Sequence, residues 1–123
     1  MQRDRRLTRP LEFQRVLRRG RAWADDLLVV KALPNDLGRT RFGFVVGRGV
    51  GKAVVRNRTK RRLREIARRA PVEQGWDVVV IARRGAGGVD YWTLKDSLEG
   101  LLRRAHLLAL GSDFLGGQPA ERG

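Results

Sequence analysis

Residues 53–70 read AVVRNRTKRRLREIARRA, and this stretch decides the fold. Wound at about 100° per residue, it gathers its apolar side chains on one arc of about 120°. That arc holds Val55, Thr59, Leu63, Ile66, Ala67 and Ala70. The opposite side holds Asn57, Arg58, Arg61, Arg64, Arg68 and Arg69. We predict a helix over about Ala53–Ala70 that packs Leu63 and Ile66 into a core and presents arginines outward.

The outward side of this helix is almost uniformly cationic. Eight of the fourteen residues from 56 to 69 are basic, and Glu65 is the only acid. Like charges three or four residues apart weaken an isolated helix by roughly 0.2–0.5 kcal/mol per pair. A merely solvated face is the alternative, but such faces usually mix the two signs. The pattern therefore favours a helix that presents its arginines to phosphates.

The whole chain shares this bias toward a polyanionic partner. Its 123 residues fit one domain, which we place at residues 1–110, with a disordered tail at 111–123. The formal net charge is +14, and residues 1–69 hold 21 basic but only 6 acidic side chains. Nucleic acid is the commonest polyanion, although a membrane surface or an acidic protein also supplies negative charge.

Several classes of protein are excluded by composition. The chain has no Cys, so it has neither disulfides nor a thiolate zinc site. Its longest apolar runs, such as Val78–Ala82, are far shorter than a membrane span. Residues 1–21 lack the apolar centre of a signal peptide. We expect a cytoplasmic protein with no membrane partner.

The segment before the basic helix predicts one helix and a pair of strands. The helix should begin at Thr8 as its N-cap, with Pro10 in the first turn, and stop at Gly20. Leu27–Leu33 has the composition of a strand, and Arg41–Val46 is predicted to be its antiparallel partner.

The segment after the basic helix predicts one strand and one helix. Trp76–Ala82 is nearly all apolar, which is typical of a central strand covered on both faces. Asp90 is placed to cap a final helix that ends at Gly111. The apolar face of that helix is Leu94, Leu98, Leu101, Leu102 and Ala105. The residues thus indicate helix, strand pair, helix, strand, helix, which is a small α+β sandwich.

Phenylalanines suggest a second contact surface. Phe13 lies on the basic first helix, and Phe42 and Phe44 share one face of the second strand. If that face meets the helix, the three rings form a groove flanked by Arg, which is a typical site for single-stranded nucleic acid. The alternative is that all three phenylalanines belong to the core, and for Phe42 and Phe44 together the core is favoured.

The glycine-rich loop at residues 47–52 resembles a P-loop only superficially. In a P-loop, Gly-Lys is followed by Ser or Thr, but Ala53 follows here, and Val46 occupies the position of the first glycine. Nucleotide hydrolysis is therefore not expected. Either the free amides of this turn, with Arg48 and Lys52, approach a phosphate backbone, or the turn is purely structural.

Catalysis by the protein itself finds no support, and we assign no catalytic or metal-binding residue. His106 is the only histidine and is expected to be structural or exposed. The pair Asp25-Asp26 precedes a strand, where it either caps a turn or holds a hydrated Mg²⁺, and the turn is favoured. The tryptophans Trp23, Trp76 and Trp92 are predicted to pack at element edges, with Trp23 also placed to stack on RNA.

The central motif identifies a family. Residues 50–61, VGKAVVRNRTKR, resemble the signature of bacterial ribonuclease P proteins, with its Arg-Asn-Arg core and following Lys-Arg. Weaker similarity at residues 12–20, 33–35, 79–83 and 90–91 extends the match to about residues 7–106. The resemblance implies the element order αβββαβα in a two-layer sandwich. Its mixed four-stranded sheet would be ribosomal protein S5 domain 2-like, with a left-handed βαβ crossover.

The resemblance also implies a division of labour. In this family an RNA subunit uses Mg²⁺ to remove the 5′ leader of precursor tRNA, and the protein assists without binding a cofactor tightly. The residues implied to contact the catalytic RNA are Arg56, Asn57, Arg58, Lys60, Arg61, Arg64 and Arg68. Those implied to contact the single-stranded leader are Phe13, Leu17, Arg48, Lys52 and Arg83. The family often has an aromatic residue at the position of Leu17, and it usually has Ser-Lys-Lys at 47–49.

Three other functions compete with this hypothesis. A ribosomal protein or general RNA chaperone would use the same basic helix. A DNA-binding module would need base-reading residues among the arginines, and Asn57 is the only candidate. A membrane-surface helix would need bulky apolar residues where this helix has mostly Val, Ala and Ile. We expect RNA, and not DNA, as the partner.

Overall fold

The computed structural model describes residues 5–109. In chain order the elements are α1 (Pro10–Arg19), β1 (Arg21–Ala24), β2 (Leu28–Pro34), β3 (Arg41–Val45), the 3-10 helix η2 (Arg48–Val50), α2 (Ala53–Arg69), β4 (Trp76–Ala82), the 3-10 helix η3 (Arg84–Gly88) and α3 (Tyr91–Arg104). This confirms the order αβββαβα. The predicted domain boundary at residue 110 and the tail at 111–123 lie outside the described residues.

The four strands form one mixed sheet in the order β1-β2-β4-β3. β4 is central, antiparallel to β2 and parallel to β3. The prediction that β3 pairs with β2 is therefore wrong. Alternation of apolar residues gives the faces of a strand but not its neighbours, and the all-apolar β4 needs a strand on each side.

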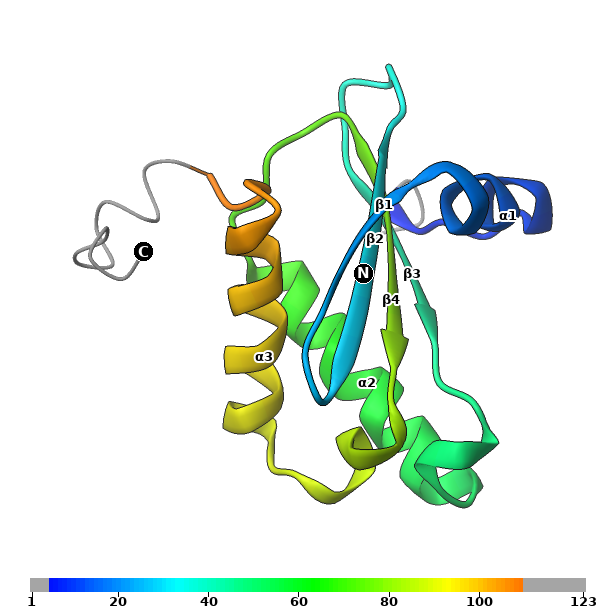
Figure 1. Ribbon diagram of the computed structural model, residues 1–123, viewed down its shortest axis with the longest axis vertical. Helices are drawn as coiled ribbons and strands as arrows, with labels where there is room; N and C mark the ends of the chain where they lie inside the picture. Colours follow the sequence, from blue (N-terminus) through cyan, green and yellow to red (C-terminus); the bar gives the residue numbers. More distant parts are fainter. Residues whose placement is uncertain (1–4, 110–123) are drawn as a thin grey trace.

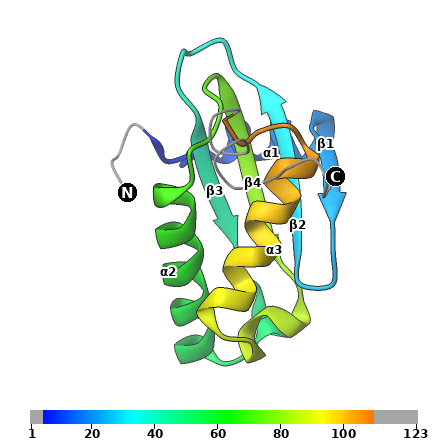
Figure 2. The same ribbon diagram turned by 90° about the vertical axis from the view of Figure 1, so that its left-hand side faces the viewer.

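The connection from β3 through α2 to β4 is a left-handed crossover. In Figure 2, α2 lies in front of the sheet, β3 runs downward, and the parallel β4 lies to its right. A right-handed connection would place β4 to the left. The general preference for right-handed crossovers is thus reversed here, as the family resemblance implies.

The helices cover the two faces of the sheet unequally. Figure 1 shows α2 and α3 together on one face and α1 alone on the other. The main core lies between the sheet and α2 and α3, and its large side chains include Leu28, Leu63, Ile66, Leu94, Leu98, Leu101 and Leu102. A second, smaller cluster under α1 consists of Leu7, Val16 and Val79. The sheet with α2 and α3 makes the expected two-layer sandwich, and α1 lies across its outer face.

The ends of two helices differ from prediction. α1 is capped by Arg9, not Thr8, because the carbonyl of Arg9 accepts the first backbone bonds and no side chain caps the helix. α3 ends at Arg104, not Gly111, since His106 takes a positive φ of 60° and the chain turns back. The backbone of Leu107 then accepts a hydrogen bond from the amide of Glu73, which fixes this turn against the loop after α2.

Strand β1 was not visible from the residues, although the resemblance implied it. Its sequence is RAWA, and only Trp23 is partly buried. A short edge strand with a single inward side chain has no apolar alternation to reveal it.

Candidate nucleic-acid interface

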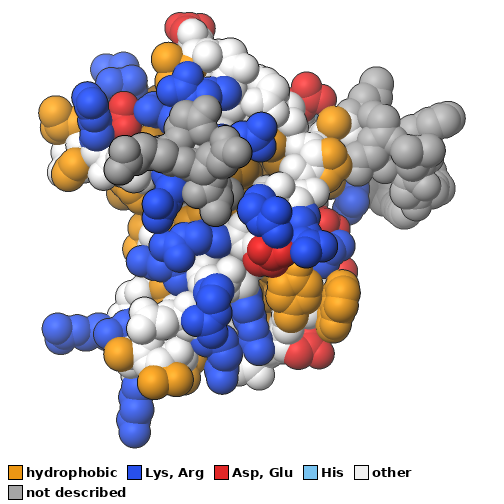
Figure 3. Space-filling view, turned by 180° about the vertical axis from the view of Figure 1, so that it is seen from behind, with side chains coloured by type: hydrophobic (Ala, Val, Ile, Leu, Met, Phe, Trp, Pro, Cys, Tyr) orange, Lys and Arg blue, Asp and Glu red, His pale blue; other side chains and the backbone are white. Residues whose placement is uncertain are grey.

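Helix α2 has the two-sided character that its sequence predicts. Leu63 and Ile66 are 0% and 1% exposed in the main core. Figure 3 shows the side of the molecule that α2 occupies, where Lys and Arg side chains form a nearly continuous band. We call its outward residues the basic face: Arg56, Asn57, Arg58, Lys60, Arg61, Arg62, Arg64, Arg68 and Arg69. Of these, Asn57, Arg61, Arg68 and Arg69 are exposed and the others are half-buried.

The two arginines of the Arg-Asn-Arg triplet are held by neighbouring loops. Arg56 donates from Nη1 to the carbonyl of Gly51 at 3.0 Å, and Arg58 donates from Nη2 to the carbonyl of Gly87 at 3.1 Å. Gly87 must be glycine, because a Cβ there would lie 2.7 Å from the carbonyl oxygen of Val50. The triplet is therefore held by the loop before α2 and by η3, and Asn57 is exposed between the two arginines.

Glu65 is the single acid on this helix, and two arginines surround it. Arg68 donates to both of its carboxylate oxygens, and Arg69 also donates to Oε2. Hydrogen bonds from Arg68 and Arg69 lower the pKa of the Glu65 carboxyl. Glu65 thus stays ionised near neutrality, and it orients Arg68 and Arg69 while removing only part of their charge.

On the other face of the sheet, α1 crosses three strands along one row of residues. The Phe13 ring lies over Gly43 on β3, and Val16 is buried with Val79 on β4. Beyond them, Lys31 on β2 donates from Nζ to the backbone carbonyl of Leu17 at 2.7 Å. Because Gly43, Val79 and Lys31 are in register, α1 runs across the strands and covers this row.

The next row of the sheet remains open beside α1. Ala24, Val29, Ile81 and Val45 are in register across all four strands. Ala24 is exposed and the other three are only half-buried, and we call these four residues the open strip. It gives an aliphatic surface that runs along α1.

The possible groove of three rings does not form. Phe42 and Phe44 point to the opposite face, where they stack with each other at 6.1 Å in the main core. Only Phe13 belongs to the α1 face. The cause is the alternation of β3, in which Gly43 and Val45 face α1 while the phenylalanines face α2 and α3. The core position favoured for Phe42 and Phe44 is confirmed.

An ion-pair network fixes α1 to the sheet at its first turn. Arg41 donates from Nε and Nη2 to the two carboxylate oxygens of Asp77, each at 2.8 Å, and from Nη1 to Glu12 on α1 at 3.2 Å. Asn35 donates to the same Asp77 at 2.8 Å. The bidentate bond to Asp77 raises the pKa of the Arg41 guanidinium. This charge contact joins the first turn of α1 to the sheet, one residue before Phe13.

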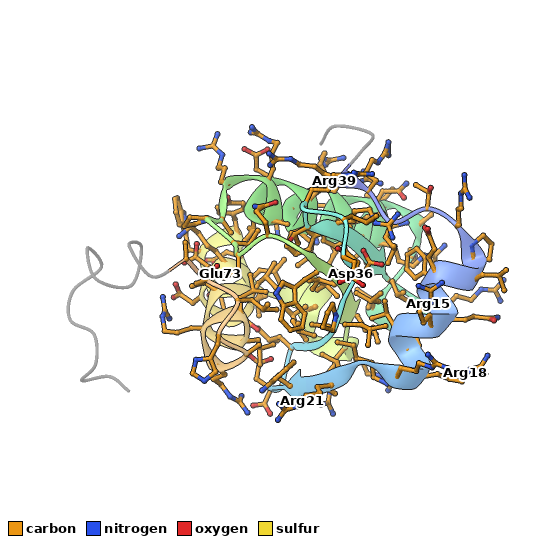
Figure 4. All side chains as sticks on the ribbon, turned by 90° about the horizontal axis from the view of Figure 1, so that it is seen from above. Arg15, Arg18, Arg21, Asp36, Arg39 and Glu73 are labelled. Carbon is orange, nitrogen blue, oxygen red and sulfur yellow. The ribbon has the colours of Figure 1, made fainter. Side chains whose placement is uncertain are left out.

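The other predicted leader-binding residues follow the open strip. Arg48 and Lys52 come after β3 and Arg83 comes after β4, and all three are exposed. Because β3 and β4 are parallel, these residues lie beyond the same end of the sheet, where both strands finish. Arg15 and Arg18 on α1 and Arg21 on the edge strand β1 are further exposed cations (Figure 4), but the Arg21 guanidinium lies against Trp23, which packs on the other face of the sheet. The glycine loop is more structural than predicted, since the amides of Val50 and Gly51 bond to Gly47 and Arg48 within η2.

Comparison with known proteins decides the family. The family model named Ribonuclease P matches residues 1–106 of the chain. The chain belongs to the ribonuclease P protein family. The ribonuclease P protein component of Dehalococcoides mccartyi is 42% identical over 113 residues, covering 92% of this chain and 94% of that protein. That of Symbiobacterium thermophilum is 46% identical over 111 residues, covering 88% and 96%.

Solved structures of the family share the fold. The ribonuclease P protein of Staphylococcus aureus superposes with a TM-score of 0.78 at 30% identity, covering 85% of this chain and 98% of that one. The Thermotoga maritima protein gives a TM-score of 0.74 at 36% identity, covering 80% and 96%. The small α+β fold with a mixed four-stranded sheet is therefore that of bacterial ribonuclease P proteins.

Two candidates for a metal or catalytic role, Asp25 and His106, lie outside the two surfaces. Asp25 caps the β1–β2 turn by accepting from the amides of Leu27 and Leu28, each at 2.9 Å, which confirms the predicted turn. His106 is exposed, and residues 5–109 contain no cluster of three potential metal ligands from His, Cys, Asp and Glu. No helix within the same range is long and apolar enough to cross a membrane.

One surface residue was misjudged from the sequence. Trp92 was predicted to pack, but its side chain is 67% exposed at the start of α3. Trp23 is partly buried against the main core, and the Arg21 guanidinium lies 5.5 Å from its ring centre. The sequence did hold a signal for the exposure of Trp92. It lies in the first turn after the Asp90 cap and two positions before the inward-facing Leu94, and residues two apart on a helix point to nearly opposite sides.

Proposed function

We propose that this chain is the protein subunit of ribonuclease P and acts in the cytoplasm on precursor tRNA. In this proposal the basic face of α2 binds the catalytic RNA. The open strip, with Phe13, Leu17 and the cations Arg48, Lys52 and Arg83, binds the single-stranded 5′ leader. The holoenzyme removes the leader by Mg²⁺-dependent endonucleolytic cleavage and leaves mature tRNA 5′ ends.

The observation that carries the proposal is the presence of two different surfaces on opposite faces of one sheet. The basic face offers closely spaced guanidinium groups, which pair bidentately with phosphates. The open strip offers an aliphatic floor beside one aromatic ring, with cations at its edge. That combination accepts unpaired nucleotides with little preference for sequence. A chain with both surfaces can hold two RNA molecules at once.

In this mechanism the protein contributes binding and charge, and the RNA subunit with its Mg²⁺ contributes the chemistry. Bringing a substrate RNA to a catalytic RNA is opposed by phosphate repulsion, which the arginines of α2 and the edge cations reduce. Holding the leader in the open strip then gives precursor tRNA an advantage over its product, because the product has no leader. Residues of this chain touch RNA but no reacting atom.

The test is reconstitution with a bacterial ribonuclease P RNA and precursor tRNA at low Mg²⁺. We expect the wild-type chain to raise both the cleavage rate and the affinity for substrates that carry a leader. Absence of both effects contradicts the proposal. Equal stimulation of an unrelated ribozyme favours a general RNA chaperone instead.

Two variants separate the surfaces. Arg61→Ala with Arg64→Ala removes cations of the basic face that have no part in the core, so the salt dependence of RNA binding should weaken. The slope of log K against log salt should change by about 0.7–0.9 per lost phosphate contact. Phe13→Ala should lower leader-dependent affinity by roughly 5- to 150-fold, the range for one stacked base. A leaderless tRNA is the control, and thermal unfolding of Phe13→Ala must show a folded protein.

A further inference from the structure

A pocket lies between α2 and the start of α3, where arginines of the basic face meet an aromatic side chain of α3. Its volume is about 390 Å³, near the lower end of the range of roughly 300–1,000 Å³ for small-molecule sites. Its lining residues are Arg61, Arg62, Arg64, Glu65, Arg68 and Tyr91. The size suits one nucleotide better than a segment of RNA duplex.

One wall of this pocket is aromatic. The Tyr91 ring lines it and is half-buried against the main core. Trp92 meets Tyr91 edge to face, with ring centres 5.0 Å apart at 89°. Because Trp92 is 67% exposed, a large apolar ring stands in solvent beside a cluster of guanidinium groups. An exposed Trp next to Tyr is typical of a contact site, since both rings offer rigid stacking area.

The remaining walls are cationic, and part of that charge is held in place. Arg62 donates from Nη1 to the carbonyl of Val89 at 3.0 Å, which fixes its guanidinium near the N-terminal end of α3. Glu65, the only acid in the lining, accepts from Arg68 and from Arg69. Asp90 lies nearby, but its carboxylate accepts the amide of Thr93 as the cap of α3. The pocket therefore combines net positive charge with one aromatic wall, Tyr91, and the exposed Trp92 ring beside it.

We propose that this pocket takes one unpaired nucleotide of the RNA that binds the basic face. The base stacks on the exposed Trp92 ring, which lies beside the pocket against Tyr91, and its phosphates lie against Arg61 and Arg64. The inference rests on the proposed function and adds to it a base-stacking contact to the catalytic RNA. The leader is not the occupant, because the open strip lies on the opposite face of the sheet from α2 and α3.

The experiment measures binding of the full chain to a bacterial ribonuclease P RNA across a salt series. Trp92→Ala should weaken binding by roughly 5- to 150-fold, the range for one stacked base, and should leave the salt slope unchanged. Trp92→Phe keeps a stacking ring and should bind within a few fold of wild type. Leu37→Ala removes an exposed apolar side chain of the β2–β3 loop and should have no effect.

Tryptophan emission gives a second readout. Stacking should quench the exposed Trp92, so wild-type emission should fall as RNA is added, and most of that fall should vanish in Trp92→Phe. If wild type binds the RNA tightly but Trp92→Ala binds equally well and the emission is unchanged, the pocket proposal is overturned and the proposed function stands. If wild type binds this RNA no better than an unrelated structured RNA, the proposed function itself fails. A loss of self-association in Trp92→Ala with unaltered RNA affinity would assign the pocket to a second copy of the chain and overturn the proposal.

Discussion

The two faces of the sheet are built differently. The face under α2 and α3 is filled by large leucines and by Phe42, all of them almost inaccessible to water. On the face under α1, the buried hydrophobic residues within residues 5–109 are Leu7, Val16 and Val79, and the open strip stays half-exposed. Stability is therefore concentrated on one face, which leaves the other free to contact a ligand. Helix α2 divides its roles in a similar way. Its inner side, with Leu63 and Ile66, packs in the main core, and its outer side presents the basic face to solvent.

The largest expected effect tests where the stability resides. Leu63→Ala on α2 should lower the free energy of unfolding by about 3 kcal/mol, because it opens a cavity in the main core. Leu17→Ala on α1 should cost only about 1 kcal/mol, because that side chain is half-exposed. Urea unfolding of the two variants measures both values. Equal losses would contradict the unequal division between the faces.

A smaller effect tests how closely α1 approaches the sheet. A Cβ on Gly43 would lie 2.8 Å from Cε1 of Phe13 and still closer to Cζ. Gly43→Ala should therefore push the Phe13 ring off β3, at a cost of about 1 kcal/mol, because the ring is partly exposed and can move. Leader-dependent affinity should fall while affinity for the catalytic RNA is unchanged.

A double-mutant cycle makes this result specific. If the steric contact is the cause, Gly43→Ala should cost less in a Phe13→Ala background than in wild type. Urea unfolding and leader affinity of the four proteins give the coupling. Additive effects would show that Gly43 matters for some reason other than Phe13.

The sequence predicted the elements better than their arrangement. The helical period of residues 53–70 showed which side of α2 is core, and the apolar run at Trp76–Ala82 showed a central strand. These signals are local, because they depend on one element packing against anything apolar. The strand order was not predictable in this way, since the residues that pair β3 with β4 are about 36 positions apart. The rows of residues under and beside α1 combine β2, β4 and β3, so they could not be predicted without the strand order.

The candidate site shows the same limit. The outward direction of the basic-face cations was predictable because the helical period separates them from Leu63 and Ile66, whatever those leucine and isoleucine side chains pack against. The groove of three rings, the less favoured alternative, does not form because β3 turns Gly43, not its phenylalanines, toward α1. Trp92 was missed because the exposure of a residue in the first turn of a helix depends on how that helix lies on its neighbours. Only the assembled fold places Tyr91 beside α2.

A finer test concerns the charge contact that holds α1. Glu12→Gln keeps an acceptor for Arg41 but loses the charge, and Arg41 retains its bidentate bond to Asp77. The contact is partly solvent-exposed, so the unfolding free energy should fall by about 0.5–1 kcal/mol. We also expect a few-fold loss of leader-dependent affinity, because Phe13 follows Glu12 on α1. Unchanged leader affinity would show that Phe13 and Val16 alone position the helix.

The smallest expected effect concerns the one carboxylate that ties β1 and β2 to the face with α3. Burial alone would raise the pKa of the Asp25 carboxyl, but the hydrogen bonds from the Ser97 hydroxyl and from the amides of Leu28 and Leu27 outweigh it, so the pKa lies below 3.8. The Ser97 Oγ donates to Oδ2 at 2.6 Å, which joins the β1–β2 turn to α3.

Because the folded pKa of Asp25 is lowered, the stabilisation is present above about pH 4 and is lost as pH falls through the folded pKa. Asp25→Asn should therefore be less stable than wild type at neutral pH, by up to about 1 kcal/mol, and the difference should shrink toward pH 2. Urea unfolding at several pH values measures it. Asp26→Asn is the matched control, since it removes a charge from the same turn without touching Ser97, and an equal pH dependence in both variants would mean that charge, not the Ser97 contact, links the turn to α3.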